Sequence, residues 1–234
     1  QAPPRGVMLL GVKGAGKSLA AKAIATAWKR PLMRLDPGSL FNKYIGETER
    51  NLRDALAQAE AMAPVVLWLD EIEKGFAASG EGGNDGGVGR RMFGTLLTWM
   101  QEHRAPVFLV ATANDIESLP PELLRKGRFD EIFFVDLPEM EVRKQIVSIH
   151  LRKRNQPANG IDLDRLAQES DGFSGAEIEQ AIVNACIDSS FFRKPLTTDL
   201  IAEQLRASPP LSVTMAEKVA WLREWARGRC VLAD

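Results

Sequence analysis

The sequence predicts an α/β domain built on a wound parallel sheet, followed by a small all-helical unit. Up to Pro138, short apolar runs alternate with stretches of helical periodicity. Several of these runs are continuously apolar, which is typical of strands buried on both faces of a parallel sheet. Beyond Pro138 the strand signal stops and only helical patterns remain. We therefore place an α/β core over residues 1–138 and a helical unit over residues 139–234.

The strands of the core are predicted at the apolar runs, over residues 6–11, 31–36, 64–70, 106–113 and 131–137. Helices are predicted between them at segments with roughly helical spacing of apolar residues, over 18–28, 49–62 and 90–102. The glycine-rich stretch over 79–89 is predicted to be a loop. In the helical unit, Pro, Gly or Asn residues separate helices predicted over 139–151, 163–170, 174–191, 198–207 and 214–229.

Composition narrows the classes of function. The net charge is −1, only 7% of the residues are aromatic, and the sequence shows no basic stripe. These three observations argue against a protein that acts on nucleic acid. No apolar run approaches the ~20 residues of a membrane span. Cys186 and Cys230 are far apart, as are His103 and His150, so neither a zinc site nor a disulfide is expected. A reducing, cytoplasmic location is the default expectation.

A phosphate-binding motif follows the first predicted strand. The motif has the P-loop spacing, in which four residues separate Gly11 from Gly16, Lys17 and Ser18. A helix is predicted to begin at Ser18. The glycines let backbone N–H groups surround phosphates, Lys17 reaches the outer phosphates, and the Ser18 hydroxyl can bind Mg²⁺. A glycine-rich turn that binds nothing is the alternative, and the strand-to-helix context argues against it.

The third predicted strand ends in two carboxylates, Asp70 and Glu71, in "VVLWLDE". Asp70 is predicted to hold the water shell of Mg²⁺, and Glu71 to orient and polarise the attacking water. A strand followed by an acidic helix cap is the alternative, and the pairing with the P-loop favours catalysis. Glu73 is assigned to the helix that follows. Asn114 ends the next strand, where its amide could bond to the terminal phosphate or to the water.

These motifs together resemble the AAA clade of the AAA+ ATPases. The resemblance rests on "GVKGAGKS", "KYIGETE", "VVLWLDEIEK", "ATAN" and "LPPELLRKGRFDEIFF", and it extends over nearly the whole chain. Three stretches are similar to a poorly characterised bacterial and plastid-encoded group of these proteins: "LDPGSLFNKYIGETE", "AEAMAPVVLWLDEIEK" and "FGTLLTWMQE". The resemblance implies a P-loop NTPase core with a helical lid, ATP and Mg²⁺ as ligands, and assembly into a ring, typically a hexamer.

The resemblance also implies which residues bind the nucleotide. They lie in the P-loop, on the first lid helix and at the start of a later lid helix: Gly14, Ala15, Gly16, Lys17, Ser18, Leu19, Ile146, His150, Gly175 and Ala176. By themselves, Ile146 and His150 would be interpreted as packing residues. Ser174 and Glu177 would be interpreted as a capping box at the start of a helix, which is compatible with nucleotide binding next to it.

Two further site assignments come from the resemblance. Arg125 and Arg128 correspond to arginine fingers that act on the ATP of a neighbouring subunit, and Asn114 to the sensor residue of the family. An ordinary basic turn is the alternative for the two arginines. Tyr44, Ile45 and Gly46 correspond to the pore loop, in which an aromatic side chain grips an extended polypeptide without sequence preference. Packing of Tyr44 on its own domain is the alternative.

The sequence thus predicts an ATPase module that forms a ring and remodels or translocates protein substrates through a central pore. A nucleotide-gated scaffold and a nucleic-acid motor are the alternatives. Val12 and Lys13 replace two prolines that are usual in this family, and Lys13 could contact phosphate, contact the next subunit, or be solvated. Because the chain begins almost at the first strand, we expect it to be part of a longer protein with a further domain upstream.

Overall fold

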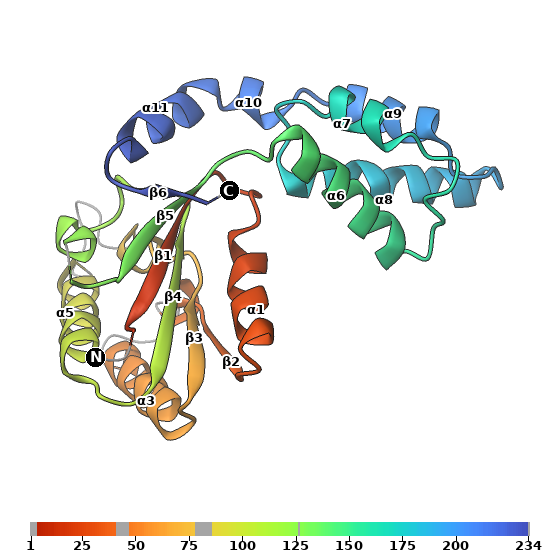
Figure 1. Cartoon of the computed structure of the whole chain (residues 1–234). Coiled ribbons are helices and arrows are strands. Elements are labelled where there is room, and N and C mark those ends of the chain that lie inside the picture. Colours follow the sequence, from red (N-terminus) through yellow and green to blue (C-terminus); the bar gives the residue numbers. More distant parts are fainter. Residues whose placement is uncertain (1–3, 41–46, 78–85, 126, 234) are drawn as a thin grey trace. The chain divides into compact units, whose positions relative to one another are not determined.

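The computed structural model describes residues 4–40, 47–77, 86–125 and 127–233 and divides into two compact units (Figure 1). The sheet unit contains the residues up to Gly11, Lys17–Val135 and those from Gly228 onward. The helical unit contains Val12–Gly16 and Asp136–Arg227. The loop over 12–16 therefore groups with the helical unit, although the segments on either side of it belong to the sheet unit.

A six-stranded parallel sheet organises the first unit, in the order β2-β3-β4-β1-β5-β6. The strands are β1 (Gly6–Gly11), β2 (Leu32–Leu35), β3 (Val65–Leu69), β4 (Val107–Ala113), β5 (Glu131–Val135) and β6 (Val231–Leu232). Each of the three central strands is buried on both faces, because its apolar run has no alternating polar positions. The predicted fold class is confirmed.

Helices cover both faces of this sheet (Figure 1). They are α1 (Lys17–Ala27), α2 (Pro37–Leu40), α3 (Glu47–Ala61), α4 (Lys74–Ala77) and α5 (Gly86–Glu102), together with the 3-10 turn Pro121–Leu124. Ala21 and Ala25 of α1 pack on Leu9, Val66 and Val110 of the sheet. On the opposite face, α3 and α5 lie next to each other. The small alanines allow α1 to approach the strands closely.

The helical unit has its own core. Its helices are α6 (Met140–Lys153), α7 (Leu163–Glu169), α8 (Gly175–Phe191), α9 (Thr198–Arg206), α10 (Leu211–Thr214) and α11 (Ala216–Ala226). Apolar side chains from the first four of these helices meet in one cluster that includes Val147, Leu166, Ile182 and Leu205. Side chains at the N-caps of α7, α8 and α9 accept hydrogen bonds from the first turn of each helix.

Three predicted boundaries are corrected by the structure. The segment predicted as one helix over 214–229 begins as α11 only at Ala216, because residues 211–214 form the separate turn α10. The end of the chain, expected to be helical, contributes β6, in which Phe133 and Phe134 of β5 pair with Val231 and Leu232. The predicted loop over 79–89 is wrong at its end, because α5 already begins at Gly86.

No helix among the described residues is long and apolar enough to cross a membrane.

Candidate functional site

The carboxyl ends of β3 and β4 bring the predicted acidic residues and Asn114 together. The two strands are parallel neighbours, with Leu69 opposite Ala111 in the register. Asp70, Glu71 and Glu73 follow β3, and Asn114 follows β4. Because parallel strands end at the same edge of a sheet, these side chains converge there.

Asp70 is buried, and both of its carboxylate oxygens accept hydrogen bonds. The Thr112 hydroxyl donates to Oδ1 at 3.0 Å. Arg34, on the edge strand β2, donates to Oδ2 through Nη2 at 2.6 Å and through Nε at 3.2 Å. The Arg34 guanidinium also lies over the Trp68 ring, 5.1 Å from its centre. Sequence reasoning missed Arg34 and Thr112, because only the strand order reveals that β2 and β4 flank β3.

Glu71 occupies a turn that the neighbouring strand holds in place. Its φ of 50° lies in the left-handed region that non-glycine residues rarely adopt. The Glu71 N–H donates to the Thr112 hydroxyl at 3.0 Å, and the Ile72 N–H donates to the Thr112 carbonyl at 2.9 Å. These bonds to β4 stabilise the strained turn, as expected for backbone strain at a functional site.

The Glu71 carboxylate contacts two polar side chains. Asn114 donates through Nδ2 to Glu71 Oε1 at 2.9 Å. Lys74, three residues further along the chain, forms an ion pair with Glu71 Oε2, and this hydrogen bond raises the pKa of Lys74. The predicted water-activating carboxylate and the predicted phosphate sensor are therefore hydrogen-bonded to each other in this structure.

Glu73, which directly precedes α4, also contacts Asn114, and the sequence did not predict this contact. Its Oε1 accepts hydrogen bonds from the Asn114 N–H at 3.0 Å and from Asn114 Nδ2 at 3.2 Å. Its side chain is buried, and burial raises the pKa of this carboxyl group, against the hydrogen bonds from Asn114. Its pattern in the sequence, two residues after Glu71 at the start of a helix, gave no signal for this contact.

Lys17, the first residue of α1, is buried near the three acidic residues. Its Nζ donates to the Gly11 carbonyl at 2.9 Å. Burial lowers the pKa of Lys17 to about 8, although the charges of Glu73, Glu71 and Asp70 oppose this change. Next to it, Ser18 is exposed and Leu19 leaves 67% of its surface in solvent. The first turn of α1 thus combines a desolvated cation with side chains that are accessible to a ligand.

The loop over 12–16 adopts conformations that require glycine, with φ of 81° at Gly14 and 99° at Gly16. Within the helical unit this loop contacts the start of α8. The Ala176 N–H donates to the Gly14 carbonyl at 3.2 Å. A Cβ on Gly14 would lie only 3.0 Å from the Ala176 Cβ and from the Ser174 hydroxyl oxygen. A side chain at position 14 would therefore force the loop away from α8.

The predicted lid residues lie near this contact. Ala15 donates its N–H to the Val12 carbonyl at 3.2 Å, closing the turn. A Cβ on Gly175 would lie 3.4 Å from Cδ1 of Ile146 and 3.5 Å from the Gly14 carbonyl oxygen. The structure therefore brings the loop, α6 and the first turn of α8 together in one unit. The capping box predicted at Ser174 and Glu177 is present.

His150, further along α6, belongs to a polar cluster. Its Nδ1 lies 3.2 Å from Oε1 of Glu179 and 3.3 Å from Nη1 of Arg154. Burial lowers the pKa of His150, against the charge of Glu179. At Nδ1 the imidazole can accept from Arg154 or donate to Glu179, depending on its tautomer.

The two predicted arginine fingers lie in the segment between the 3-10 turn and β5. Arg125 is exposed, whereas Arg128 is half-buried and donates through Nη1 to the Leu97 carbonyl of α5 at 3.2 Å. The segment is fixed at its end, because the Asp130 carboxylate accepts the N–H groups of Arg5 at 2.6 Å and Gly6 at 2.8 Å. Neither arginine is part of the cluster at the ends of β3 and β4. The predicted pore-loop residues Tyr44, Ile45 and Gly46 lie outside the described residues.

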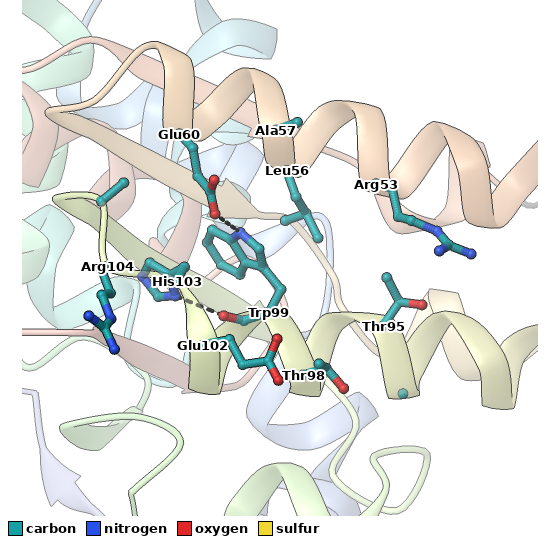
Figure 2. Close-up of a pocket in the computed structure, with 12 residues that line it drawn as sticks. Arg53, Leu56, Ala57, Glu60, Thr95, Thr98, Trp99, Glu102, His103 and Arg104 are labelled. Carbon is teal, nitrogen blue, oxygen red and sulfur yellow. Dashed lines mark hydrogen bonds between the residues drawn. The ribbon is translucent and has the colours of Figure 1, made fainter.

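A groove of about 860 Å³ between α3 and α5 is a separate feature of the sheet unit (Figure 2). Trp99 forms its wall, donating through Nε1 to Glu60 at 2.6 Å and stacking on the His103 ring at 4.1 Å. None of the described residues that line the groove belongs to the P-loop or to the acidic cluster. We therefore place the chemistry at the ends of β3 and β4 and not in this groove.

Comparisons with known proteins identify the family of this chain. The model of the ATPase family associated with various cellular activities (AAA) matches residues 7–137, and the model of the AAA+ lid domain matches residues 160–189. An uncharacterized AAA domain-containing protein ycf46 of Guillardia theta is 46% identical over 224 residues, which is 95% of this chain and 44% of that protein. Its counterpart in Trieres chinensis is 45% identical over 99% of this chain and 47% of that protein.

A more distant relative is the cell division cycle protein 48 homolog of Archaeoglobus fulgidus. It is 35% identical over 208 residues, covering 88% of this chain and 28% of that protein. The chain thus spans less than half the length of the curated relatives that it matches.

Proposed function

Because this chain belongs to the AAA family of ATPases, we propose that it is the ATP-hydrolysing module of a ring-forming protein that remodels or translocates protein substrates. One observation carries the catalytic part of this proposal. The Glu71 carboxylate is hydrogen-bonded to the Asn114 amide at 2.9 Å, at a sheet edge that it shares with the buried Lys17. A base, a polar sensor and a cation are the groups that phosphoryl transfer to water requires.

In the proposed reaction, water attacks the terminal phosphorus of ATP and the bond to the bridging oxygen of ADP breaks. Glu71 orients this water and accepts its proton, and Asn114 holds the Glu71 carboxylate at the position that the hydrogen bond shows. Lys17 stabilises negative charge on the outer phosphates. Burial lowers the pKa of Lys17, because the buried cation has little solvation, and the phosphates would supply that solvation.

The side chains fit the Mg²⁺ that accompanies ATP in this reaction. Ser18 and Asp70 offer hard oxygen ligands, and Mg²⁺ usually keeps several waters and takes its other ligands from phosphate. Both oxygens of Asp70 already accept hydrogen bonds, from Arg34 and Thr112, which suits contact with metal-bound water better than direct coordination. When bound, the ion would neutralise charge that develops on the phosphate oxygens.

We assign the nucleoside part of ATP to the contact between the loop and the lid helices. Gly14 and Gly16 would offer backbone N–H groups to phosphate from the left-handed conformations of the loop, which Ala15 closes by its hydrogen bond to the Val12 carbonyl. Ile146 and His150 of α6, with Gly175 and Ala176 of α8, would contact the base and ribose. The hydrogen bond from Ala176 to Gly14 supports this proposal, since it links the phosphate-binding loop directly to α8.

We further propose that the site is completed by a second copy of the chain. Arg125 and Arg128 belong to a segment that is anchored by Asp130, outside the acidic cluster of their own chain. Such arginines can stabilise the transition-state charge of a neighbour's phosphate, which is worth on the order of 10³–10⁵ in rate for GTPases. A ring, hexameric in the family that the sequence resembles, would place each finger at the next subunit's ATP.

The substitution Glu71→Gln tests the catalytic assignment. Glutamine keeps the shape and the hydrogen bond from Asn114 but cannot accept a proton from water, so ATP should still bind while turnover falls by on the order of 10²–10⁴. Equilibrium binding of a fluorescent ATP analogue and single-turnover hydrolysis measure the two quantities. Turnover at the wild-type rate would refute the role of Glu71.

The substitution Tyr44→Ala tests the threading role and distinguishes it from a nucleotide-gated scaffold. Loss of the aromatic ring removes the apolar grip on a polypeptide but leaves the phosphate site intact. We expect basal ATP hydrolysis within about twofold of wild type and loss of unfolding of a tagged, destabilised client protein in the assembled protein. Client unfolding that survives the substitution would favour the scaffold.

A further inference from the structure

Glu73 is a buried acidic residue to which the proposed mechanism assigns no step. One of its oxygens, Oε1, accepts two hydrogen bonds from a single residue, the Asn114 N–H at 3.0 Å and the Asn114 Nδ2 at 3.2 Å. The same Nδ2 also donates to Glu71 Oε1 at 2.9 Å. Since the side-chain amide nitrogen carries two hydrogens, both hydrogens of Asn114 Nδ2 are used, one for each carboxylate.

These contacts determine the position of the Asn114 side chain. The hydrogen bond from the Asn114 backbone N–H to Glu73 Oε1 fixes the residue that follows β4. The hydrogen bond from Asn114 Nδ2 to the same oxygen fixes the orientation of the side-chain amide. Together they leave the second hydrogen of the amide directed at Glu71. The orientation of the proposed catalytic carboxylate therefore depends on Glu73 through Asn114 at Oε1, while Lys74 contacts its other oxygen, Oε2.

The burial of Glu73 argues against a merely supporting role in the turn. Only 7% of its surface is exposed, and its second oxygen, Oε2, has no hydrogen-bond partner among the described residues. A buried polar group with an unsatisfied atom is costly and calls for a functional reason. The helix that follows, α4, has only four residues. Stabilising the start of so short a helix is therefore a weak reason to bury the Glu73 carboxylate.

We infer that Glu73 is a positioning residue for hydrolysis, which holds the Asn114 amide so that Asn114 directs the Glu71 carboxylate. This inference rests on the proposed function, because the chemistry is assigned to Glu71. The role requires a hydrogen-bond acceptor at the position of Oε1 and does not require a negative charge. Burial, which raises the pKa of this carboxyl group, is consistent with that requirement.

The test compares Glu73→Gln with Glu73→Met in the assembled protein. Glutamine keeps an acceptor oxygen and the volume, whereas methionine keeps the volume and removes the acceptor. We expect the methionine variant to lose roughly ten- to hundredfold in the single-turnover rate, with the Kd for a fluorescent ATP analogue changed by less than about twofold. The glutamine variant should stay within about threefold of the wild-type rate. Glu117→Met, which alters an exposed glutamate of the same unit, is the matched control and should leave both quantities unchanged.

A double-mutant cycle with Asn114→Ala separates positioning from general support of the fold. If Glu73 acts through Asn114, the methionine substitution should have almost no further effect on the rate once Asn114 is absent. Single-turnover reactions followed for hours keep the slow variants measurable. Rate losses that multiply in the double variant would overturn the inference, as would a glutamine variant as slow as the methionine variant. Glu71→Gln is measured alongside: retained turnover there would refute the proposed function itself, and this inference with it.

Discussion

Replacement of Lys17 by methionine should abolish ATP binding and at the same time raise the thermal stability of the nucleotide-free protein. The two effects have one cause. Lys17 is 6% exposed, and burial lowers its pKa to about 8, so its charge is carried at neutral pH without full solvation. Bound phosphate would solvate this charge, so its loss abolishes ATP binding. Methionine carries no charge, so the nucleotide-free variant no longer has a poorly solvated buried cation.

The expected magnitudes follow from the same displacement of the pKa. A shift from 10.5 to about 8 corresponds to at most about 3 kcal/mol of destabilisation, reduced by the lost hydrogen bond to the Gly11 carbonyl. The melting temperature without nucleotide should therefore rise by a few degrees. Hydrolysis should fall by on the order of 10³ or more, because the phosphates lose their cation. Differential scanning fluorimetry with and without ATP measures the first effect, and Lys22→Met, on the exposed side of α1, is the matched control. A lower melting temperature, or ATP binding that survives, would contradict this account of Lys17.

The stability difference between the two proteins should also depend on pH. Below about pH 8, Lys17 is protonated in both the folded and the unfolded wild-type chain, so the full penalty is present. Between about 8 and 10.5 the unfolded chain binds more protons than the folded chain, and this group makes the wild type more stable as pH rises. The advantage of Lys17→Met should therefore shrink across that window, as measured by urea unfolding of both proteins at matched pH. An advantage that is constant from pH 7 to 10 would show that desolvation of Lys17 is not its origin.

Arg128→Ala carries the other large expected effect, a loss of turnover of on the order of 10³ with ATP binding retained. Arg128 is the better candidate of the two arginines, because the bond from Nη1 to the Leu97 carbonyl fixes its position before any partner arrives. Arg104→Ala, which changes an arginine at the groove between α3 and α5, is the matched control and should leave turnover unchanged. If both variants hydrolyse ATP at the wild-type rate, Arg128 is not a finger, and its role is confined to its contact with α5.

The sequence predicted the elements whose signal is local. Apolar runs, several of them continuous, identified strands β1 to β5, and the position of Asp70, Glu71 and Asn114 at the ends of two of these runs marked them as candidate site residues. The sequence did not predict the hydrogen bond between Asn114 and Glu71. The P-loop could also be predicted from a local signal, because its glycines, Lys17 and the following helix are contiguous in the chain. The structure shows Gly14 and Gly16 in the left-handed conformations that the motif requires.

Contacts that depend on strand order or on an unusual backbone conformation were not predictable. Arg34 reaches Asp70 because β2 pairs with β3, and nothing in the sequence around Arg34 states which strand lies next to it. Glu73 reaches Asn114 because the turn places Glu71 at a φ of 50°, which no helix or strand pattern encodes. β6 was missed because two residues are too few to show a periodicity.

The most direct test of a shared catalytic site is to mix two inactive variants. Glu71→Gln removes the proposed base and keeps the proposed arginine finger, whereas Arg128→Ala removes the proposed finger and keeps the proposed base. If each site combines Glu71 of one copy with Arg128 of the next, a random equal mixture in a ring should regain about a quarter of the wild-type ATPase rate. The expected result is therefore an ATPase rate in the mixture that exceeds the sum of the two separate variants and rises with protein concentration. A mixture no more active than its components at every concentration would contradict the account, because each chain would then hydrolyse ATP alone or not at all.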